Sequence, residues 1–155
     1  MLFRSIDPLH IRIAREYFGI RYANVRIVQG DARRWLRQHQ QRWDYLIDDV
    51  FQHGEDDPLR PFELDRSWYA LLAERLNPGG AIIQNHIDLV AARAAARTLR
   101  SHGLKTLELE TAGYANRVVA AFDSQMPAAR LRAAVERQLA AMPRSVTRRL
   151  RHRLY

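Results

Sequence analysis

Apolar residues follow two kinds of spacing along the chain. Short apolar runs predict strands over residues 2–6, 25–28, 45–47, 81–83, 104–109 and 118–122. Apolar residues at helical spacing predict helices that begin near residues 8, 32, 64, 88 and 127, and residues 144–155 are expected to be a basic helical or frayed end. Strands and helices alternate, and the last two strands are joined through Gly113 as a hairpin. This order predicts an α/β layered fold with a largely parallel sheet and helices on both faces.

The stretch 43–51 combines a strand signal with candidate chemistry. Its apolar residues Tyr45, Leu46 and Ile47 are bounded by carboxylates, which is typical of a strand buried on both faces of a parallel sheet. Asp48 and Asp49 then fall at the carboxyl end of that strand, where ligands bind in open α/β sheets. Adjacent carboxylates at such an edge are costly unless they are solvated, paired or used. The alternative interpretation is that one of them only caps the following loop.

Two other aspartates precede predicted helices. Asp7 stands before Pro8, and proline fits the first turn of a helix, so we expect Asp7 to cap that helix. Asp31 follows Gly30 and is expected to cap the next helix in the same way. His86 follows the strand 81–83, and we expect an exposed loop histidine there rather than an acid or base. Trp35 and Trp68 are expected to pack in the core.

The bulk composition fits one globular domain. The chain has 155 residues, of which 47% are hydrophobic and 27% charged. No apolar run approaches the roughly 20 residues that span a bilayer, and the first residues are too short an apolar run for a signal peptide. The sequence has no cysteine, which excludes disulfides, a thiolate nucleophile and a cysteine-based zinc site. We expect a cytoplasmic protein with no metal site and no membrane contact.

The net charge of +8 is concentrated at the C-terminal end. Residues 1–125 hold 17 basic and 16 acidic residues, whereas residues 126–155 hold eight arginines and the single acid Glu136. We therefore predict a main domain over residues 1–125 and a basic C-terminal helical segment over residues 126–155. Nucleic-acid binding by this segment is a weaker interpretation, because it lacks interleaved aromatic residues other than Tyr155.

Several stretches together resemble one protein family. The stretches are Ile6-Asp7-Pro8 with the helix 13–19, Val25–Arg33 with its Gly-Asp turn, the stretch 43–51, and Leu76-Asn77-Pro78-Gly79-Gly80. In this order and spacing they are similar to spermidine synthases, the polyamine aminopropyltransferases of the class I adenosylmethionine-dependent methyltransferase fold. The resemblance covers residues 2–85 and extends more weakly to about residue 122. It implies a Rossmann-like three-layer sandwich with a C-terminal antiparallel hairpin and with the first strand–helix unit missing.

The resemblance also implies a function and a site. It implies alkyl (aminopropyl) transfer from adenosylmethionine or decarboxylated adenosylmethionine to a small-molecule amine. Asp31 would accept a hydrogen bond from the adenine amino group, and Ala32 would offer its backbone N–H to the ring. Asp49 matches the catalytic aspartate that deprotonates the amine. The cofactor-binding residues by resemblance are Ser5, Asp7, Gly30, Asp31, Ala32 and Asp48, and the substrate-binding residues are Asp49 and Gln52.

Three departures from the family pattern stand out. The glycine-rich loop, with the strand before it and the helix after it, is absent, and a lost central strand leaves unpaired backbone groups or forces a new pairing. Ser5 stands where the family has a glutamate for the ribose hydroxyls, and Gln52 where many members have a second acid. The acidic run 55–57 would attract a polycationic amine or would only be a solvated loop. The alternatives are an adenosylmethionine-dependent methyltransferase and a non-catalytic, partner-binding relative, and family members also suggest a homodimer.

Overall fold

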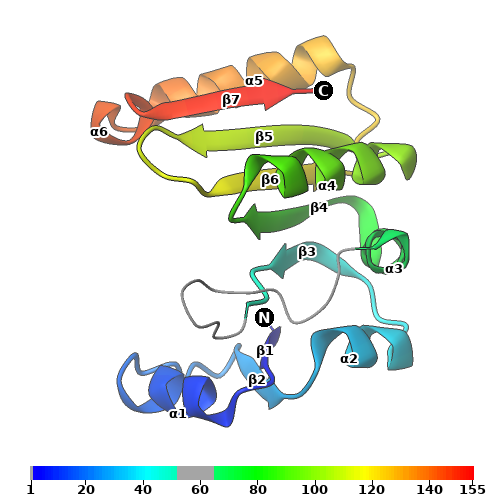
Figure 1. Ribbon diagram of the computed structural model, residues 1–155, viewed down its shortest axis with the longest axis vertical. Coiled ribbons are helices and arrows are strands. Elements are labelled where there is room, and N and C mark those ends of the chain that lie inside the picture. Colours follow the sequence, from blue (N-terminus) through cyan, green and yellow to red (C-terminus); the bar gives the residue numbers. More distant parts are fainter. Residues whose placement is uncertain (1, 52–64) are drawn as a thin grey trace. The chain divides into compact units, whose positions relative to one another are not determined.

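The computed structural model describes residues 2–51 and 65–155 (Figure 1). Contacts within the described residues group them into two compact units, one up to Gln41 and the other from Arg42 onward. Gln52 and the acidic run 55–57, to which the sequence analysis assigned substrate roles, lie outside the described residues. Among the described helices, none combines the length and the apolar character needed to cross a bilayer.

The first unit is a parallel strand pair with two helices. Its elements are β1 (Leu2–Ser5), α1 (Pro8–Glu16), β2 (Arg26–Gln29) and α2 (Ala32–Gln38). β1 pairs with β2 so that Leu2 lies opposite Arg26 and Ser5 opposite Gln29. The predicted caps are confirmed, because the Asp7 side chain accepts a hydrogen bond from the Leu9 N–H and the Asp31 side chain from the Arg34 N–H. Both carboxylates therefore stand where their strand has ended and their helix begins.

The second unit is a five-stranded sheet with helices on both faces. Its elements are β3 (Trp43–Asp48), α3 (Arg66–Glu74), β4 (Leu76–His86), α4 (Leu89–Ser101), β5 (Lys105–Thr111), β6 (Arg117–Phe122), α5 (Ala128–Ala141), α6 (Arg144–Thr147) and β7 (Leu150–Leu154). The strand order is β3-β4-β6-β5-β7. β3 runs parallel to β4, and the three remaining pairings are antiparallel, including the predicted hairpin β5–β6.

Alternate residues of the strands face different helices. Thr106 is fully buried on the side of α4 and accepts a hydrogen bond from Arg100 of that helix. Its neighbour Leu107 belongs to a cluster with Ala120 and Leu154, against which Leu131 and Val135 of α5 pack. Because successive strand residues point to opposite faces, α4 and α5 cover opposite faces of the sheet (Figure 1). The predicted α/β class, with helix, sheet and helix in three layers, is confirmed.

Three local predictions are wrong. Residues 150–154 form the edge strand β7 rather than a helix or a frayed end, because Leu154 is buried beside Leu107 while Arg151 and Arg153 stay exposed. The Asn77–Gly80 turn lies within β4, where the register against β3 shifts between Trp43 and Tyr45. β3 is not buried on both faces, since Tyr45 and Ile47 are each 71% exposed at the edge of the sheet. Among the described residues, β4 is the strand that pairs with β3.

The irregular part of β4 depends on one glycine. Gly80 passes so close to β3 and to its own strand that a Cβ atom there would come within 2.9 Å of the carbonyl oxygens of Asp44 and Asn77. Only glycine fits this approach without a shift of the backbone. The Asn77 side chain donates a hydrogen bond of 2.9 Å to Asp44 and ties the same irregular segment to β3.

Candidate functional site

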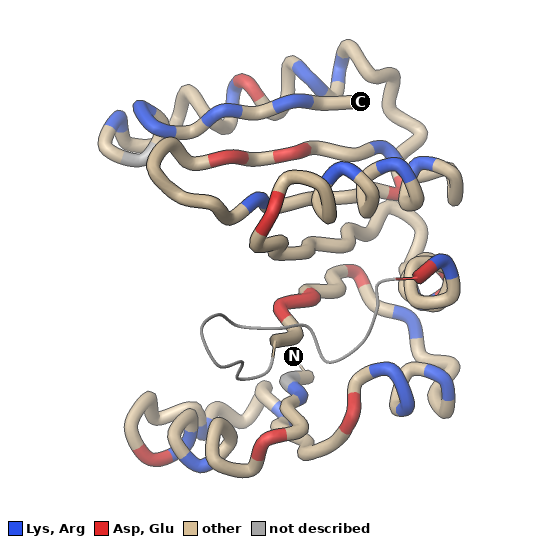
Figure 2. The backbone as a smooth tube through the Cα atoms, viewed as in Figure 1, with Lys and Arg blue, Asp and Glu red and all other residues tan. Residues whose placement is uncertain are grey.

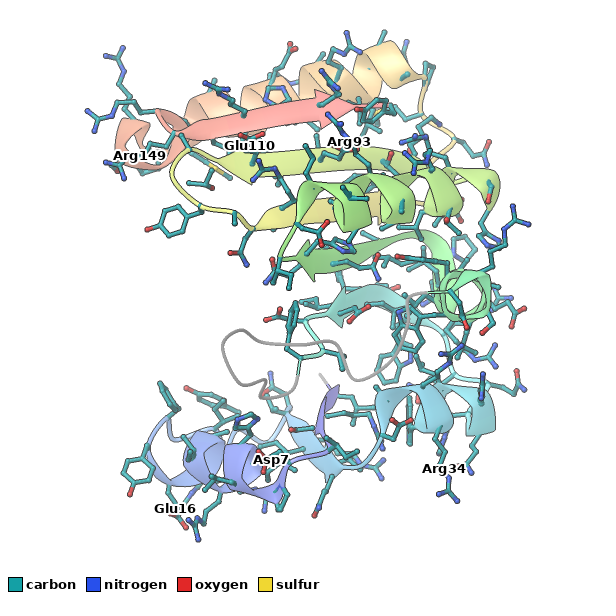
Figure 3. The ribbon with its side chains drawn as sticks, viewed as in Figure 1. Asp7, Glu16, Arg34, Arg93, Glu110 and Arg149 are labelled. Atoms are coloured by element: carbon teal, nitrogen blue, oxygen red, sulfur yellow. The ribbon has the colours of Figure 1, made fainter. Side chains whose placement is uncertain are left out.

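The first unit gathers its candidate residues at the carboxyl ends of β1 and β2. The Gly30 N–H donates to the Ser5 carbonyl oxygen at 2.9 Å, and the Ser5 hydroxyl oxygen accepts from the Asp7 N–H at 3.2 Å. Asp7 then opens α1, as its label in Figure 3 shows, and Asp31 opens α2. Ser5, Asp7, Gly30 and Asp31 are therefore neighbours because two parallel strands end side by side.

Asp31 keeps part of its hydrogen-bonding capacity. Its Oδ1 atom accepts from the Arg34 N–H, which is the capping interaction. Within the described residues, no hydrogen bond reaches its Oδ2 atom, and the residue is partly exposed. A carboxylate has about four acceptor positions, so capping leaves room for a ligand donor. The start of α2 adds backbone N–H groups that have no partner inside the helix, beginning at Ala32.

Arg4 is a residue at this site that the sequence analysis missed. Its guanidinium lies over the Trp35 ring, 4.6 Å from the ring centroid. It also fills the space beside Gly30, where a Cβ atom would come within 2.6 Å of Arg4 Nη2 and where φ is +152°. Burial lowers the pKa of Arg4, while the charge of Asp31 acts in the opposite direction. Arg4 therefore supports the Gly30–Asp31 turn, and no sequence motif indicated it.

A separate hollow lies beside α1 and β2. It has a volume of about 690 Å³, and its lining residues include the apolar Ile11 and Ile27 and the arginines Arg12, Arg15 and Arg21. Pro8 and Gln29 also line it, and these residues are the chain neighbours of Asp7 and Gly30. The hollow therefore adjoins the candidate site, although Asp31 itself is not among the residues that line it.

Asp48 and Asp49, at the carboxyl end of β3, have different surroundings. Asp48 is buried, and its Oδ2 atom accepts hydrogen bonds from Trp68 Nε1 at 2.9 Å and from Gln84 Nε2 at 2.8 Å. The Val50 N–H donates to its Oδ1 atom at 3.3 Å. Trp68 packs in the core as predicted, at 1% exposure, and it also holds this carboxylate. The cofactor-binding role of Asp48 stays a prediction.

Asp49 is exposed and is oriented by an amide. Its Oδ1 atom accepts a hydrogen bond of 3.1 Å from Nδ2 of Asn85, the second-last residue of β4. The Asn85 side-chain oxygen in turn accepts from Asn116 Nδ2 at 3.2 Å, just before β6. Asn85 thus presents its N–H to Asp49 because Asn116 occupies its oxygen. The polar run Gln84-Asn85-His86 at the carboxyl end of a strand was the signal that could have found this amide.

The burial of His86 differs from the sequence prediction. His86 ends β4 and is 1% exposed, so the expectation of an exposed loop histidine is wrong; the strand extends three residues beyond Ile83 and carries it into the interior. In residues 2–51 and 65–155, no group of three or more histidine, aspartate or glutamate side chains is placed to hold a metal ion.

The structure resembles solved transferases. No protein-family model matches this sequence, and no curated protein matches it. A probable spermidine synthase from Corynebacterium glutamicum has a TM-score of 0.68 at 20% identity, over 90% of this chain and 54% of that one. A spermidine synthase in complex with the transition state analogue AdoDATO has a TM-score of 0.65 at 15% identity, over 96% of this chain and 60% of that one. Human methyltransferase-like protein 13, in complex with SAH, has a TM-score of 0.68 at 18% identity, over 92% of this chain and 72% of that one.

These likenesses concern the fold, because the sequence identities are low. The chain spans little more than half the length of the two spermidine synthases. The resemblance to both kinds of neighbour extends over nearly all of this chain. The chain therefore has the fold that spermidine synthases share with adenosylmethionine-dependent methyltransferases.

Proposed function

We propose that this chain is a transferase domain that moves an alkyl group from adenosylmethionine or decarboxylated adenosylmethionine to an amine. The observation that carries the proposal is the exposed Asp49 carboxylate, held by Asn85 at the carboxyl end of β3. Asp48 stands next to it and is buried and hydrogen-bonded, so the two carboxylates have different environments. Different environments for adjacent acids are typical of sites where one acid supports the structure and the other does chemistry.

The nucleoside half of the donor fits the first unit. Asp31 retains an acceptor for an exocyclic amine, and the N-terminus of α2 offers N–H groups, beginning at Ala32, for a ring nitrogen. Ser5 and Asp7 lie beside this turn, although their side chains are partly used within the chain. The bound donor supplies an alkyl group on a sulfonium sulfur. Within the first unit, the described residues are suited to bind the adenosine part of the donor.

Asp49 supplies the acid–base chemistry in this proposal. An alkyl amine is protonated at neutral pH, so it needs a carboxylate as counter-charge and as base before it can attack carbon. Asp49 takes one proton from the ammonium group and frees the nitrogen lone pair. The neutral amine then forms the new C–N bond as the C–S bond breaks, and the sulfur leaves as a neutral thioether. Asn85 donates to the same carboxylate and holds its direction. The remaining contribution is the alignment of amine, carbon and sulfur.

A methyltransferase of the same fold is the second candidate. The neighbour in complex with SAH, human methyltransferase-like protein 13, has the same TM-score of 0.68 as one of the spermidine synthases. Asp31 would serve both donors, because they share the adenosine part. The two candidates differ in the leaving thioether, which is methylthioadenosine after aminopropyl transfer and S-adenosylhomocysteine after methyl transfer. The amine substrate and a cytoplasmic location stay predictions.

The test is a turnover assay that separates these products. The full chain is incubated with a diamine and with either decarboxylated or intact adenosylmethionine, and the two thioethers are separated by chromatography. We expect Asp49→Asn to lower kcat by about 10²–10⁴-fold, the usual contribution of a positioned base. Asp44→Asn is the matched control, because Asp44 is an exposed acid of β3, the strand that Asp49 follows, and it also binds an asparagine. Equal activity of the Asp49 variant and the unchanged chain would overturn the catalytic assignment, and absence of both products would favour a non-catalytic relative.

A further inference from the structure

The turn between β5 and β6, residues 112–116, reaches the candidate site through its last residue. Asn116 Nδ2 donates to Asn85 Oδ1 at 3.2 Å, and Asn85 Nδ2 donates to Asp49 Oδ1 at 3.1 Å. Asn85 lies opposite Val118 of β6, so Asn116, two residues before Val118, is on the same face of the sheet as Asn85. One line of hydrogen bonds therefore leads from the turn to the candidate catalytic carboxylate.

Arg117 holds this turn from the opposite face of β6. Its Nη1 atom donates to three consecutive carbonyl oxygens, those of Tyr114, Ala115 and Asn116, each at 3.1 Å. Because Arg117 directly follows Asn116, the two side chains point to opposite faces of the strand. The Arg117 side chain is only 17% exposed. Three carbonyl groups turned toward one nitrogen restrict the backbone of the turn, and they set the place from which Asn116 reaches the site.

The carboxylate of Glu110 holds Arg117 in place. Glu110 lies opposite Arg117 in the register of β5 and β6, and its Oε1 atom is 3.4 Å from Arg117 Nη2. Figure 3 labels Glu110 on β5, and Figure 2 shows the acidic positions of this strand in red. Opposite charges directly across two strands stabilise the strand pair. The guanidinium therefore binds the carboxylate with one nitrogen and the turn with the other, which requires the planar fork of arginine.

We propose that Asn116 and Arg117 are positioning residues for Asp49, an inference that rests on the proposed transfer reaction. Arg117 fixes the turn, Asn116 binds the amide oxygen of Asn85, and the amide N–H of Asn85 is thereby directed at the Asp49 carboxylate. Each residue acts through the next one, and neither Asn116 nor Arg117 needs to contact the substrate. A base that is held in one direction is aligned for proton transfer when the amine arrives.

The first test observes the Asn85 amide and needs no turnover. Nitrogen-15 relaxation of the side-chain NH₂ group of Asn85 gives its order parameter in the full chain, and we expect Asn116→Ala to lower it. Asn116 is exposed, so this variant should keep the circular dichroism spectrum of the unchanged chain. Asn77→Ala is the control, because Asn77 binds Asp44 and not the Asn85 line. An Asn85 amide that is equally ordered in Asn116→Ala and in the unchanged chain would overturn the proposal.

The second test measures turnover. We expect Asn116→Ala and Arg117→Met each to lower kcat about 3–10-fold, whereas KM for the donor should change little. Arg153→Met is the control for Arg117→Met, because Arg153 lies opposite Glu108 as Arg117 lies opposite Glu110, and it should leave kcat unchanged. Unchanged kcat in Asn116→Ala, or an equal fall in the control, would overturn the proposal. Absence of turnover in the unchanged chain would overturn the proposed function instead, and the amide measurement would then decide the positioning roles alone.

Discussion

The indole N–H of Trp68 donates a hydrogen bond of 2.9 Å to the Asp48 carboxylate and ties α3 to the end of β3. Gln84 of β4 donates to the same oxygen at 2.8 Å, so three elements meet at one buried acid. Asp49, the next residue, is exposed and is held by Asn85 instead. The strand thus ends with one carboxylate turned into the protein and one turned outward. This alternation follows from the period of two in a strand.

Asp48 is expected to stabilise the fold. In Asp48→Asn the amide oxygen can still accept from Trp68 and Gln84, which share one carboxylate oxygen, but the amide N–H then faces the Val50 N–H, so a buried donor is left without an acceptor. A buried donor without its partner costs about 1–3 kcal/mol. We expect a decrease of that size in the free energy of unfolding, measured by urea titration. Asp44→Asn should change it by less than about 0.5 kcal/mol, since Asp44 is exposed; equal effects of the two substitutions would show that the buried network adds no stability.

Asn85 is expected to act on turnover through Asp49. Asn85→Ala removes the hydrogen bond that directs the Asp49 carboxylate, and a hydrogen bond to a charged group contributes about 1.5–3 kcal/mol. We expect kcat of the transfer reaction to fall about 10–100-fold while KM for the donor changes little. Asn77→Ala is the matched control, because Asn77 makes the same kind of bond to Asp44. A fall in kcat that is the same for both variants would mean that Asn85 acts only on the fold.

β7 is expected to stabilise the fold through its buried leucine and not through its exposed arginines. Leu154 is buried and contacts the cluster around Leu107, so Leu154→Ala should lower the free energy of unfolding by about 2–5 kcal/mol. The double substitution Arg151→Ser and Arg153→Ser removes two charges from exposed positions of the same strand and should have little effect on stability. Thermal unfolding compares the two variants. A larger loss from the arginine substitutions would contradict the strand assignment.

The melting temperature is expected to be low. A strand pair such as β1–β2 is only marginally stable by itself, and β3 has an edge without a partner among the described residues. We expect thermal unfolding, followed by circular dichroism, to give a midpoint below the range of about 45–65 °C that is usual for mesophilic domains. A high melting temperature would be the opposite result.

Local signals predicted most of the elements and both helix caps. The sequence Asp7-Pro8 and the turn Gly30-Asp31 each combine an acceptor with a helix start, and each forms the expected cap. The strand 43–48 and the place of Asp48 and Asp49 at its carboxyl end were also predicted from the sequence. These features depend on neighbouring residues along the chain, and for that reason periodicity and capping rules were sufficient.

Features that depend on distant residues were not predicted. The strand β7 forms because Leu154 meets Leu107 of β5, which no local pattern of Arg149–Arg153 indicates. Arg4 approaches Gly30 only because β1 and β2 are paired. The exposure of Tyr45 and Ile47 follows from the position of β3 at the edge of the sheet, whereas their apolar character predicted burial.

Calorimetric titration with methylthioadenosine tests the central claim most directly. This ligand carries the adenine, the ribose and the thioether without charge, so its affinity reports on the site around Asp31. We predict micromolar binding to the unchanged chain and binding at least about tenfold weaker to Asp31→Asn, which keeps the cap but loses the carboxylate. Asp88→Asn alters the equivalent cap of α4 and should bind as the unchanged chain does. A folded chain that does not bind methylthioadenosine, or that binds it equally well in Asp31→Asn, would contradict the account.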